Sequence, residues 1–290
     1  MHQTFRKGND RSLTTLVSGL TFAEAPRWHD GRLYYSDFYR HVVEAVDSVG
    51  NVELIAKVPN QPSGLGWLPD GRLLVVSMTD RKLLRLEASG ELVEHADLSQ
   101  IATWHCNDMV VDGVGRAYVG NFGYDIEALG AEPVMAKLAC VEPDGTVRVV
   151  AENLHFPNGA VITPDGNTLI ISETLGCKLT AFDISGDGSL SNRREWASIY
   201  PHFPDGVCLD EAGGVWVADP GQSKLIRVVE GGEITDEIDP GNGVFACMLG
   251  GEDRKRLFVC TASASGSKAA KNRHAKIEWI DVAYAGAVAP

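Results

Sequence analysis

Residues 62–77 read PSGLGWLPDGRLLVVS, and residues 157–173 read PNGAVITPDGNTLIISE. Each stretch combines a short apolar segment, a turn that contains Asp-Gly, and a second segment rich in Val, Leu and Ile. The Asp-Gly pair supplies the positive φ angles that tight hairpins need. Both stretches are therefore predicted to form hairpins of two antiparallel strands.

The same pattern recurs six times along the chain. The other copies begin at Glu24, Asn107, Pro204 and Phe245. Equivalent positions of the second segment lie 40 to 52 residues apart, at Leu33, Leu73, Ala117, Leu169, Val215 and Leu257. Further strand-like runs lie between the copies, and four strands in a repeat of about 40–50 residues are typical of a propeller blade. We predict an all-β, six-bladed β-propeller with four-stranded blades, in one domain over residues 1–290.

The two ends of the repeat array predict how the ring closes. The last repeat ends after its third strand, at residues 277–282, while an unassigned strand-like run at residues 13–17 precedes the first repeat. We expect the N-terminal strand to pair into the last blade, because this removes an exposed sheet edge. A weak candidate at residues 97–102 is the one segment with a helical pattern.

Charge and composition limit the expected partners. The chain has 290 residues with 26 Lys and Arg against 39 Asp and Glu, a net charge of −13, which argues against nucleic acid. Apolar runs are shorter than the roughly 18 residues of a membrane span, and residues 1–20 lack the apolar core of a secretory signal. We expect a cytoplasmic protein that is a monomer or weak homo-oligomer. Its six cysteines lack zinc-like spacing and are expected to be reduced and buried.

One position of the repeat, just before each first strand, carries mostly polar residues. These ring positions are Glu24, Ser63, Asn107, Asn158, Asp205 and Ala246. Because first strands line the channel of a propeller, the side chains are predicted to meet at one mouth. Two carboxylates and two amides there require a cationic partner, and their oxygens suit Ca²⁺ best, with Mg²⁺, Mn²⁺, Zn²⁺ and Fe²⁺ as alternatives. A turn role is the alternative for Asn158 and Asp205, since each precedes glycine, and Asp108 either supports the ligands or belongs to a turn.

Histidines and aromatic residues gather near the same predicted mouth. His105 lies two residues before Asn107, and two matching segments read HFPN from His155 and HFPD from His202. His105 and His202 are candidates for proton transfer, and His105 also for substrate contact, because imidazole titrates near neutral pH. Packing of the loops is the competing interpretation for His155 and His202. An apolar wall for the substrate is predicted from Phe22, Trp104, Phe122, Tyr124 and Phe245.

In combination and order, these motifs resemble the senescence marker protein/gluconolactonase/luciferin-regenerating family of six-bladed propellers. The resemblance rests on GLTFAEAPRW around Glu24, CNDMVVD with Asn107, FPNG with Asn158 and FPDG with Asp205, and it covers residues 16–282. It implies a metal-dependent hydrolase that opens a lactone, a cyclic ester, to its hydroxy acid. Glu24, Asn158 and Asp205 would be metal ligands, Asn107 a ligand or substrate contact, and Asp205 also the general base.

Several alternatives remain beside this interpretation. His105 stands where sugar-lactone members of the family have an Arg, so a less polar lactone or cyclic ester competes with a sugar lactone. His202 or His105 competes with Asp205 as the base, because a bound cation lowers the pKa of a carboxylate. The same metal site could serve an organophosphate or other ester hydrolase, or the propeller could bind a small molecule or protein without catalysis. The sequence has no GxSxG elbow and no GxGxxG after a strand.

Overall fold

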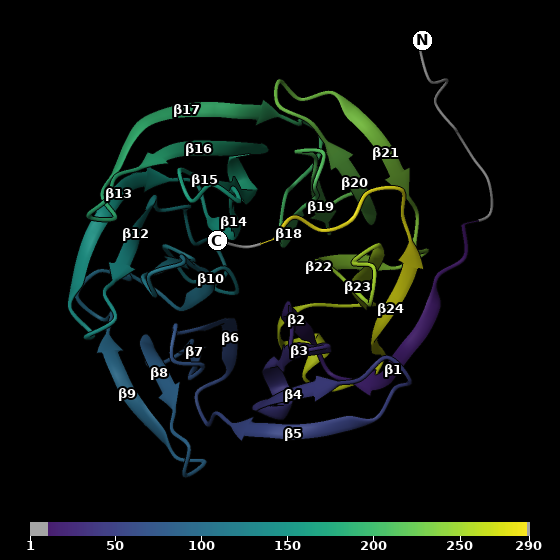
Figure 1. The fold of residues 1–290 in the computed structure, drawn as a ribbon, viewed down its shortest axis with the longest axis horizontal. Helices are drawn as coiled ribbons and strands as arrows, with labels where there is room; N and C mark the ends of the chain where they lie inside the picture. The colour runs from purple at the N-terminus through teal and green to yellow at the C-terminus, as the bar shows by residue number, and fades with distance from the viewer. Residues whose placement is uncertain (1–10, 289–290) are drawn as a thin grey trace.

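The structure is a computed structural model that describes residues 11–288, and it confirms the predicted all-β, six-bladed propeller. Six sheets are arranged around a central axis (Figure 1). Residues 1–10, on which part of the expectation about a secretory signal rests, lie outside the described residues, as do residues 289–290. In the described part of the chain the one α-helix, α1 (Gly266–Ala269), has four residues, and no helix there is long and apolar enough to cross a bilayer.

Each blade is one antiparallel sheet, and in blades 1 to 5 the strands run in sequence order from the axis outward. Blade 1 consists of β2 (Ala23–His29), β3 (Arg32–Asp37), β4 (Val42–Val46) and β5 (Val52–Lys57). Blade 2 consists of β6 (Pro62–Trp67), β7 (Leu73–Ser77), β8 (Lys82–Leu86) and β9 (Leu92–Asp97). Blade 3 consists of β10 (Cys106–Val111), β11 (Ala117–Asn121), β12 (Ala136–Val141) and β13 (Val147–Leu154).

The second half of the chain repeats this arrangement. Blade 4 consists of β14 (Pro157–Ile162), β15 (Thr168–Glu173), β16 (Lys178–Ile184) and β17 (Leu190–Ser198). Blade 5 consists of β18 (Val207–Leu209), β19 (Val215–Asp219), β20 (Lys224–Val228) and β21 (Ile234–Ile238). Blade 6 consists of β22 (Gly243–Gly250), β23 (Arg256–Ala262), β24 (Ala275–Asp281) and the N-terminal β1 (Thr14–Leu20). Two 3₁₀ turns, η1 (Phe38–Arg40) and η2 (Thr174–Gly176), follow β3 and β15.

The N-terminal strand closes the ring as predicted. β1 pairs antiparallel with β24, with Thr14 opposite Trp279 and Leu20 opposite Ala275. The last blade therefore receives its outer strand from the start of the chain, and the two ends of the array are held by a backbone ladder rather than by side-chain packing alone.

The core lies between neighbouring blades, which explains the uninterrupted apolar runs of the sequence. Every residue of β7, β11 and β19 is buried, because both faces of these second strands pack against other blades. In contrast, the outer strand β21 alternates between half-buried and exposed residues before it ends at the buried Ile238. The largest fully buried side chains include Trp216, Tyr35, Tyr118 and Phe258.

The helical expectation at residues 97–102 is wrong. β9 extends to Asp97, and a single turn follows in which the Leu98 carbonyl accepts the N–H groups of Ile101 and Ala102. The chain then enters blade 3, so the apolar residues of this segment pack as a turn against the core instead of continuing a helix. The six cysteines are free thiols as expected, five of them buried and Cys177 half-buried.

After β24 the C-terminal segment, yellow in Figure 1, runs inward across the propeller toward β18. Gly286 donates its N–H to the Arg254 carbonyl at 2.8 Å, and Ala287 donates to the Leu209 carbonyl at 2.9 Å. These contacts lie at the β22–β23 turn and at the end of β18, opposite the strand starts that carry the ring positions.

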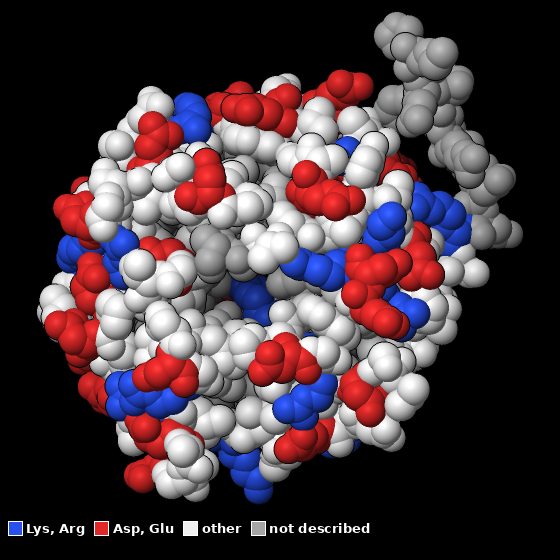
Figure 2. Space-filling model, in the orientation of Figure 1, with Lys and Arg blue, Asp and Glu red and all other residues white. Residues whose placement is uncertain are grey.

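In the view of Figure 2, acidic and basic side chains mix around the periphery and the face is hollowed at its centre.

Candidate functional site

Five of the ring positions lie inside innermost strands, next to β-bulges, and not just before the strands as predicted; Asp205 alone precedes its strand, β18. Each innermost strand contacts its neighbours on both sides around the axis. In five of them the pairing register slips next to the ring position, at Glu24, Ser63, Asn107, Asn158 and Ala246. A bulge bends its strand and redirects a side chain, and bulges are common beside active sites. The sequence gives no direct sign of these bulges, although it placed the affected residues at equivalent positions.

The glycines that follow Asn158 and Asp205 are packing glycines rather than turn glycines. Asn158 lies inside β14, and neither Gly159 nor Gly206 has a positive φ. A Cβ on Gly159 would lie 2.6 Å from the Val207 nitrogen, and a Cβ on Gly206 would lie 2.7 Å from the Ala246 Cα. These approaches leave no room for a side chain, so glycine lets neighbouring innermost strands meet. The alternative interpretation of Asn-Gly and Asp-Gly as turns is therefore wrong for both sites.

The two ring carboxylates lie close enough to affect each other. Burial raises the pKa of Glu24 to about 8, and the Asp108 carboxylate adds to this, while the Ala25 N–H and Arg27 lower it. Burial and then the Glu24 carboxylate raise the pKa of Asp205 well above its usual range. Neither Glu24 nor Asp205 forms an ion pair within residues 11–288. Two carboxylates in this state are an unfavourable arrangement unless protons or a cation neutralise them.

Asp108 has a partner of its own. Its Oδ1 accepts a hydrogen bond from Arg27 Nη2 at 2.6 Å and from the Met109 N–H at 2.8 Å. Both side chains of this ion pair are largely buried. Asp108 is thus a strand residue in a salt bridge beside the ring, which excludes the turn role considered for it.

The two ring amides complete a set of oxygen donors. Asn107 is 5% exposed, and its Nδ2 has no hydrogen-bond partner among the described residues. Asn158 is 7% exposed, donates to Thr174 Oγ1 at 3.3 Å, and lowers the pKa of Asp205 by hydrogen bonding. Within residues 11–288 no three His, Cys, Asp or Glu side chains form a metal cluster. A pair of carboxylates with a pair of amides is a different set, and it fits a hard divalent cation.

Buried acidic residues anchor the loops that lead to the ring, a feature that our sequence analysis missed. Asp37 accepts the Phe22 N–H, Glu173 accepts the His155 N–H, and Asp219 accepts the Phe203 N–H. All three acids are fully buried at the ends of second strands. The repeated endings YYSD, LIISE and VWVAD were the available signal.

The three anchors differ in what neutralises them. Asp37 has Arg40 at 3.5 Å, and Glu173 has Arg193 at 3.0 Å. Asp219 has His202 instead, with 2.6 Å between its Oδ2 and the histidine Nδ1. In the described part of the chain, no Lys or Arg forms an ion pair with Asp219.

The contact with Asp219 gives His202 a different chemical role from that of His155. A carboxylate at Nδ1 makes that nitrogen the donor, which leaves Nε2 as the proton acceptor of a neutral imidazole. His202 is 13% exposed and lies three residues before Asp205. His155 is bonded to its own anchor only through the backbone N–H.

An aromatic wall lines the blade 3 side of the mouth. The His105 ring stacks on Trp104 at 4.8 Å between centroids and lies 6.1 Å from Phe122, which stacks on Phe156 at 4.9 Å. Burial lowers the pKa of His105, which favours the neutral imidazole. Tyr124 is half-buried on the loop that follows Phe122. Of the residues predicted for the wall, Trp104 and Phe122 therefore both lie against His105, the candidate for substrate contact.

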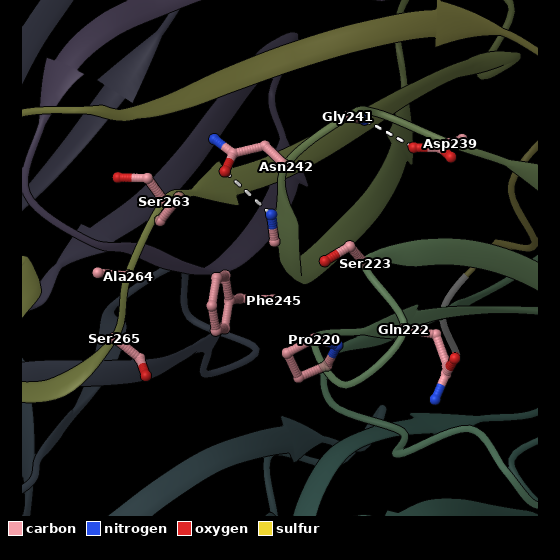
Figure 3. A pocket seen from close by; sticks show the side chains of 12 residues that line it. Pro220, Gln222, Ser223, Asp239, Gly241, Asn242, Phe245, Ser263, Ala264 and Ser265 are labelled. Carbon is pink, nitrogen blue, oxygen red and sulfur yellow. Dashed lines mark hydrogen bonds between the residues drawn. The ribbon is translucent and has the colours of Figure 1, made fainter.

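A second aromatic cluster lies on the opposite side, between blades 1 and 6. Phe22 contacts Phe245 edge to face at 4.7 Å and Phe38 at 5.3 Å. Phe245 in turn lines a cavity of about 530 Å³ between blades 5 and 6, which Figure 3 shows from close by. The cavity was not predicted, because its walls come from three connecting loops without a common motif.

Comparisons with known proteins agree with this architecture. A curated regucalcin of Danio rerio is 25% identical over 254 residues, covering 82% of each chain. A pentonolactonase of Haloferax volcanii is 26% identical over 253 residues, covering 85% of this chain and 84% of the relative. Among solved structures, a calcium-binding regucalcin of Agrobacterium tumefaciens superposes with a TM-score of 0.80 at 19% identity, covering 96% of both chains.

The family comparison is the most specific of these findings. The family model described as the SMP-30/Gluconolactonase/LRE-like region matches residues 22–263, which include every ring position. The match confirms the resemblance seen in the sequence motifs. The chain therefore belongs to the SMP-30/gluconolactonase/LRE-like family.

Proposed function

We propose that this protein is a metal-dependent lactonase that uses the ring at the mouth of the propeller. The observation that carries the proposal is the close approach of Glu24 and Asp205, two buried carboxylates with raised pKa values, beside the Asn158 amide that hydrogen-bonds to Asp205. The Asn107 amide is buried on the neighbouring innermost strand, and its Nδ2 has no partner among the described residues. Hydrolysis of lactones is supported by the family and by the pentonolactonase among the relatives. The product of the reaction would be the open-chain hydroxy acid.

The ligands of the ion would be Glu24, Asn107, Asn158 and Asp205. Their all-oxygen character favours Ca²⁺ over softer metals, and the name of the calcium-binding structural neighbour agrees with this choice. When bound, a divalent ion supplies Lewis-acid polarisation of the lactone carbonyl and neutralises the charge of the two carboxylates. The small-molecule substrate is the expected partner, and the cytoplasmic location and the monomeric or weakly oligomeric state stay predictions.

The chain offers two acceptors for the proton of the attacking water. Asp205 lies in the ring itself, whereas His202, three residues earlier in the chain, has its Nδ1 held by Asp219, which leaves Nε2 as the acceptor. A carboxylate that binds a cation is a weaker base, so we assign the proton transfer to His202 and the binding role to Asp205. His105, kept neutral by its buried aromatic stack, would contact the substrate together with Trp104, Phe122 and Tyr124.

A substrate panel on the metal-loaded protein tests the proposal. Lactones, phosphotriesters and linear esters are compared by acid release for the natural chain and for the variants Asp205→Asn and Glu24→Gln. We expect lactones to be the best substrates and both variants to lose at least 100-fold in kcat/KM, since each removes a charged ligand. Phosphotriester turnover above lactone turnover would favour the organophosphate hydrolase instead. Lack of turnover with all three classes would favour a binding propeller.

A further inference from the structure

The cavity between blades 5 and 6 has a composition that points to a ligand class. We call it the blade 5–6 pocket, and its walls come from the β19–β20, β21–β22 and β23–β24 connections. Figure 3 shows Phe245 between the segments that carry Ser265 and Pro220, and Asn242 and Ser223 line the same pocket. The volume of about 530 Å³ lies in the usual range for small-molecule sites.

The polar groups of the pocket are largely free to bind a ligand. Hydrogen bonds within the twelve lining residues join Asn242 Oδ1 to the Gly243 N–H at 3.1 Å and Asp239 Oδ1 to the Gly241 N–H at 2.8 Å. The hydroxyls of Ser223 and of the other lining serines bond to none of these residues. The Asn242 Nδ2 and the serine hydroxyls can therefore donate to, or accept from, a bound molecule.

The charge of the pocket excludes the other common ligand classes. Among the described residues that line it there is no Lys, Arg or His, so none of them neutralises a phosphate, sulfonate or carboxylate. The one acidic residue of this lining, Asp239, is paired with Lys224 at 2.9 Å, so a free cation gains little there. An apolar chain would desolvate hydroxyl and amide groups without replacing their hydrogen bonds. A neutral ligand with many hydroxyls and one apolar face remains, and Phe245 is placed to contact that face.

The position of the pocket connects it with the ring. Phe245 directly precedes Ala246, the ring position without an oxygen, and its carbonyl accepts the Gly206 N–H at 2.9 Å. On the other wall, Pro220 directly follows Asp219, which holds His202. A molecule whose lactone lies at the ring can thus extend a substituent over the blade 6 side into this pocket.

We propose that the blade 5–6 pocket binds a neutral saccharide unit attached to the lactone, so that the preferred substrate is a glycosylated aldonolactone. The inference rests on the proposed lactonase function and names its substrate class. Water adds to the ester carbonyl, the ring C–O bond breaks and its oxygen takes up a proton, while the glycosidic bond stays intact. The pocket then contributes binding energy that a single-ring lactone cannot use.

The test compares gluconolactone with the lactone of maltobionic acid, which carries one further glucose unit. For the natural chain we expect kcat/KM to be at least tenfold higher for the disaccharide lactone. Asn242→Ala removes an amide, and Ser263→Trp fills the pocket at an exposed position. Both variants should lose the preference and keep the natural rate with gluconolactone. Ser89→Trp, at an exposed position outside the pocket walls, is the control and should change neither rate.

Equal kcat/KM for the two lactones in the natural chain, or an unchanged preference in Ser263→Trp, would overturn the inference. Saccharide binding is measured separately, by isothermal titration of the natural chain and of Ser263→Trp with maltose. Saturable binding by the natural chain alone supports the pocket, and equal or no binding by both overturns it. Failure of the lactonase function is a different result, in which neither lactone is hydrolysed.

Discussion

The protonation of Glu24 makes the stability of the metal-free protein depend on pH in an unusual direction. Its pKa is raised from 4.5 to about 8 by burial, and below pH 4.5 the carboxyl is protonated in both folded and unfolded chains. Between these values the folded protein keeps a proton that the unfolded chain has lost. The free energy of unfolding should therefore fall by about 1.4 kcal/mol per pH unit, and by roughly 5 kcal/mol in all once the pH exceeds the folded-state pKa.

The assay is urea unfolding of the chelator-treated protein between pH 5 and pH 8.5, for the natural chain and for Glu24→Gln. The variant has no proton to lose at this position, so we expect it to lack the part of the decline that Glu24 causes, to keep the part that the buried Asp205 causes, and to be the more stable protein at pH 8. Glu91→Gln, at an exposed position, is the control and should follow the natural chain.

Addition of Ca²⁺ should reverse the trend for the natural chain, because the ion binds the deprotonated carboxylates and its affinity rises with pH. Parallel pH profiles of unfolding free energy for the natural chain and Glu24→Gln without metal would contradict the assignment of this pH dependence to Glu24. Such a result would mean that Glu24 is not an uncompensated buried carboxylate.

Two further predictions concern packing and proton transfer. Gly206→Ala should lower the free energy of unfolding, measured by thermal denaturation, by about 1–3 kcal/mol, because the added Cβ meets blade 6. Gly186→Ala is the control, and because its Cβ would point into open space it should cost less than about 0.5 kcal/mol. Equal losses would contradict the packing role of Gly206. Asp219→Asn should lower kcat/KM at least tenfold, because an amide at Nδ1 no longer fixes that nitrogen of His202 as the donor and Nε2 as the acceptor. Glu173→Gln, at the equivalent anchor that accepts the His155 backbone N–H, should lower kcat/KM less, and equal losses would contradict the pairing.

The propeller could be predicted because each repeat can be recognised from the residue pattern of a short segment. Asp-Gly turns and doubly buried second strands such as 73–77 recur at a regular spacing, and closure by the N-terminal strand follows from the missing fourth strand of the last repeat. The weak helix at residues 97–102 was mispredicted, because one apolar turn has the same short pattern as the start of a helix.

The candidate site was predicted in its membership but not in its geometry. Equivalent repeat positions identified the ring, yet the bulges at Glu24 and Asn158 depend on pairing between strands, which no local pattern records. The glycine after Asn158 has the composition of a turn, and only the approach of β18 shows its packing role. The contact between His202 and Asp219 joins two segments whose pairing required the fold.

A calcium titration tests whether lactone hydrolysis depends on one metal ion bound at the ring. The purified protein is stripped with a chelator, verified as metal-free by elemental analysis, and titrated with Ca²⁺ while lactone hydrolysis and bound metal are followed together. We expect negligible hydrolysis before Ca²⁺ is added and full activity at one ion per chain. The double variant Glu24→Gln, Asp205→Asn should neither bind Ca²⁺ nor regain hydrolysis. Full lactone hydrolysis by the verified metal-free protein would contradict this dependence on the metal.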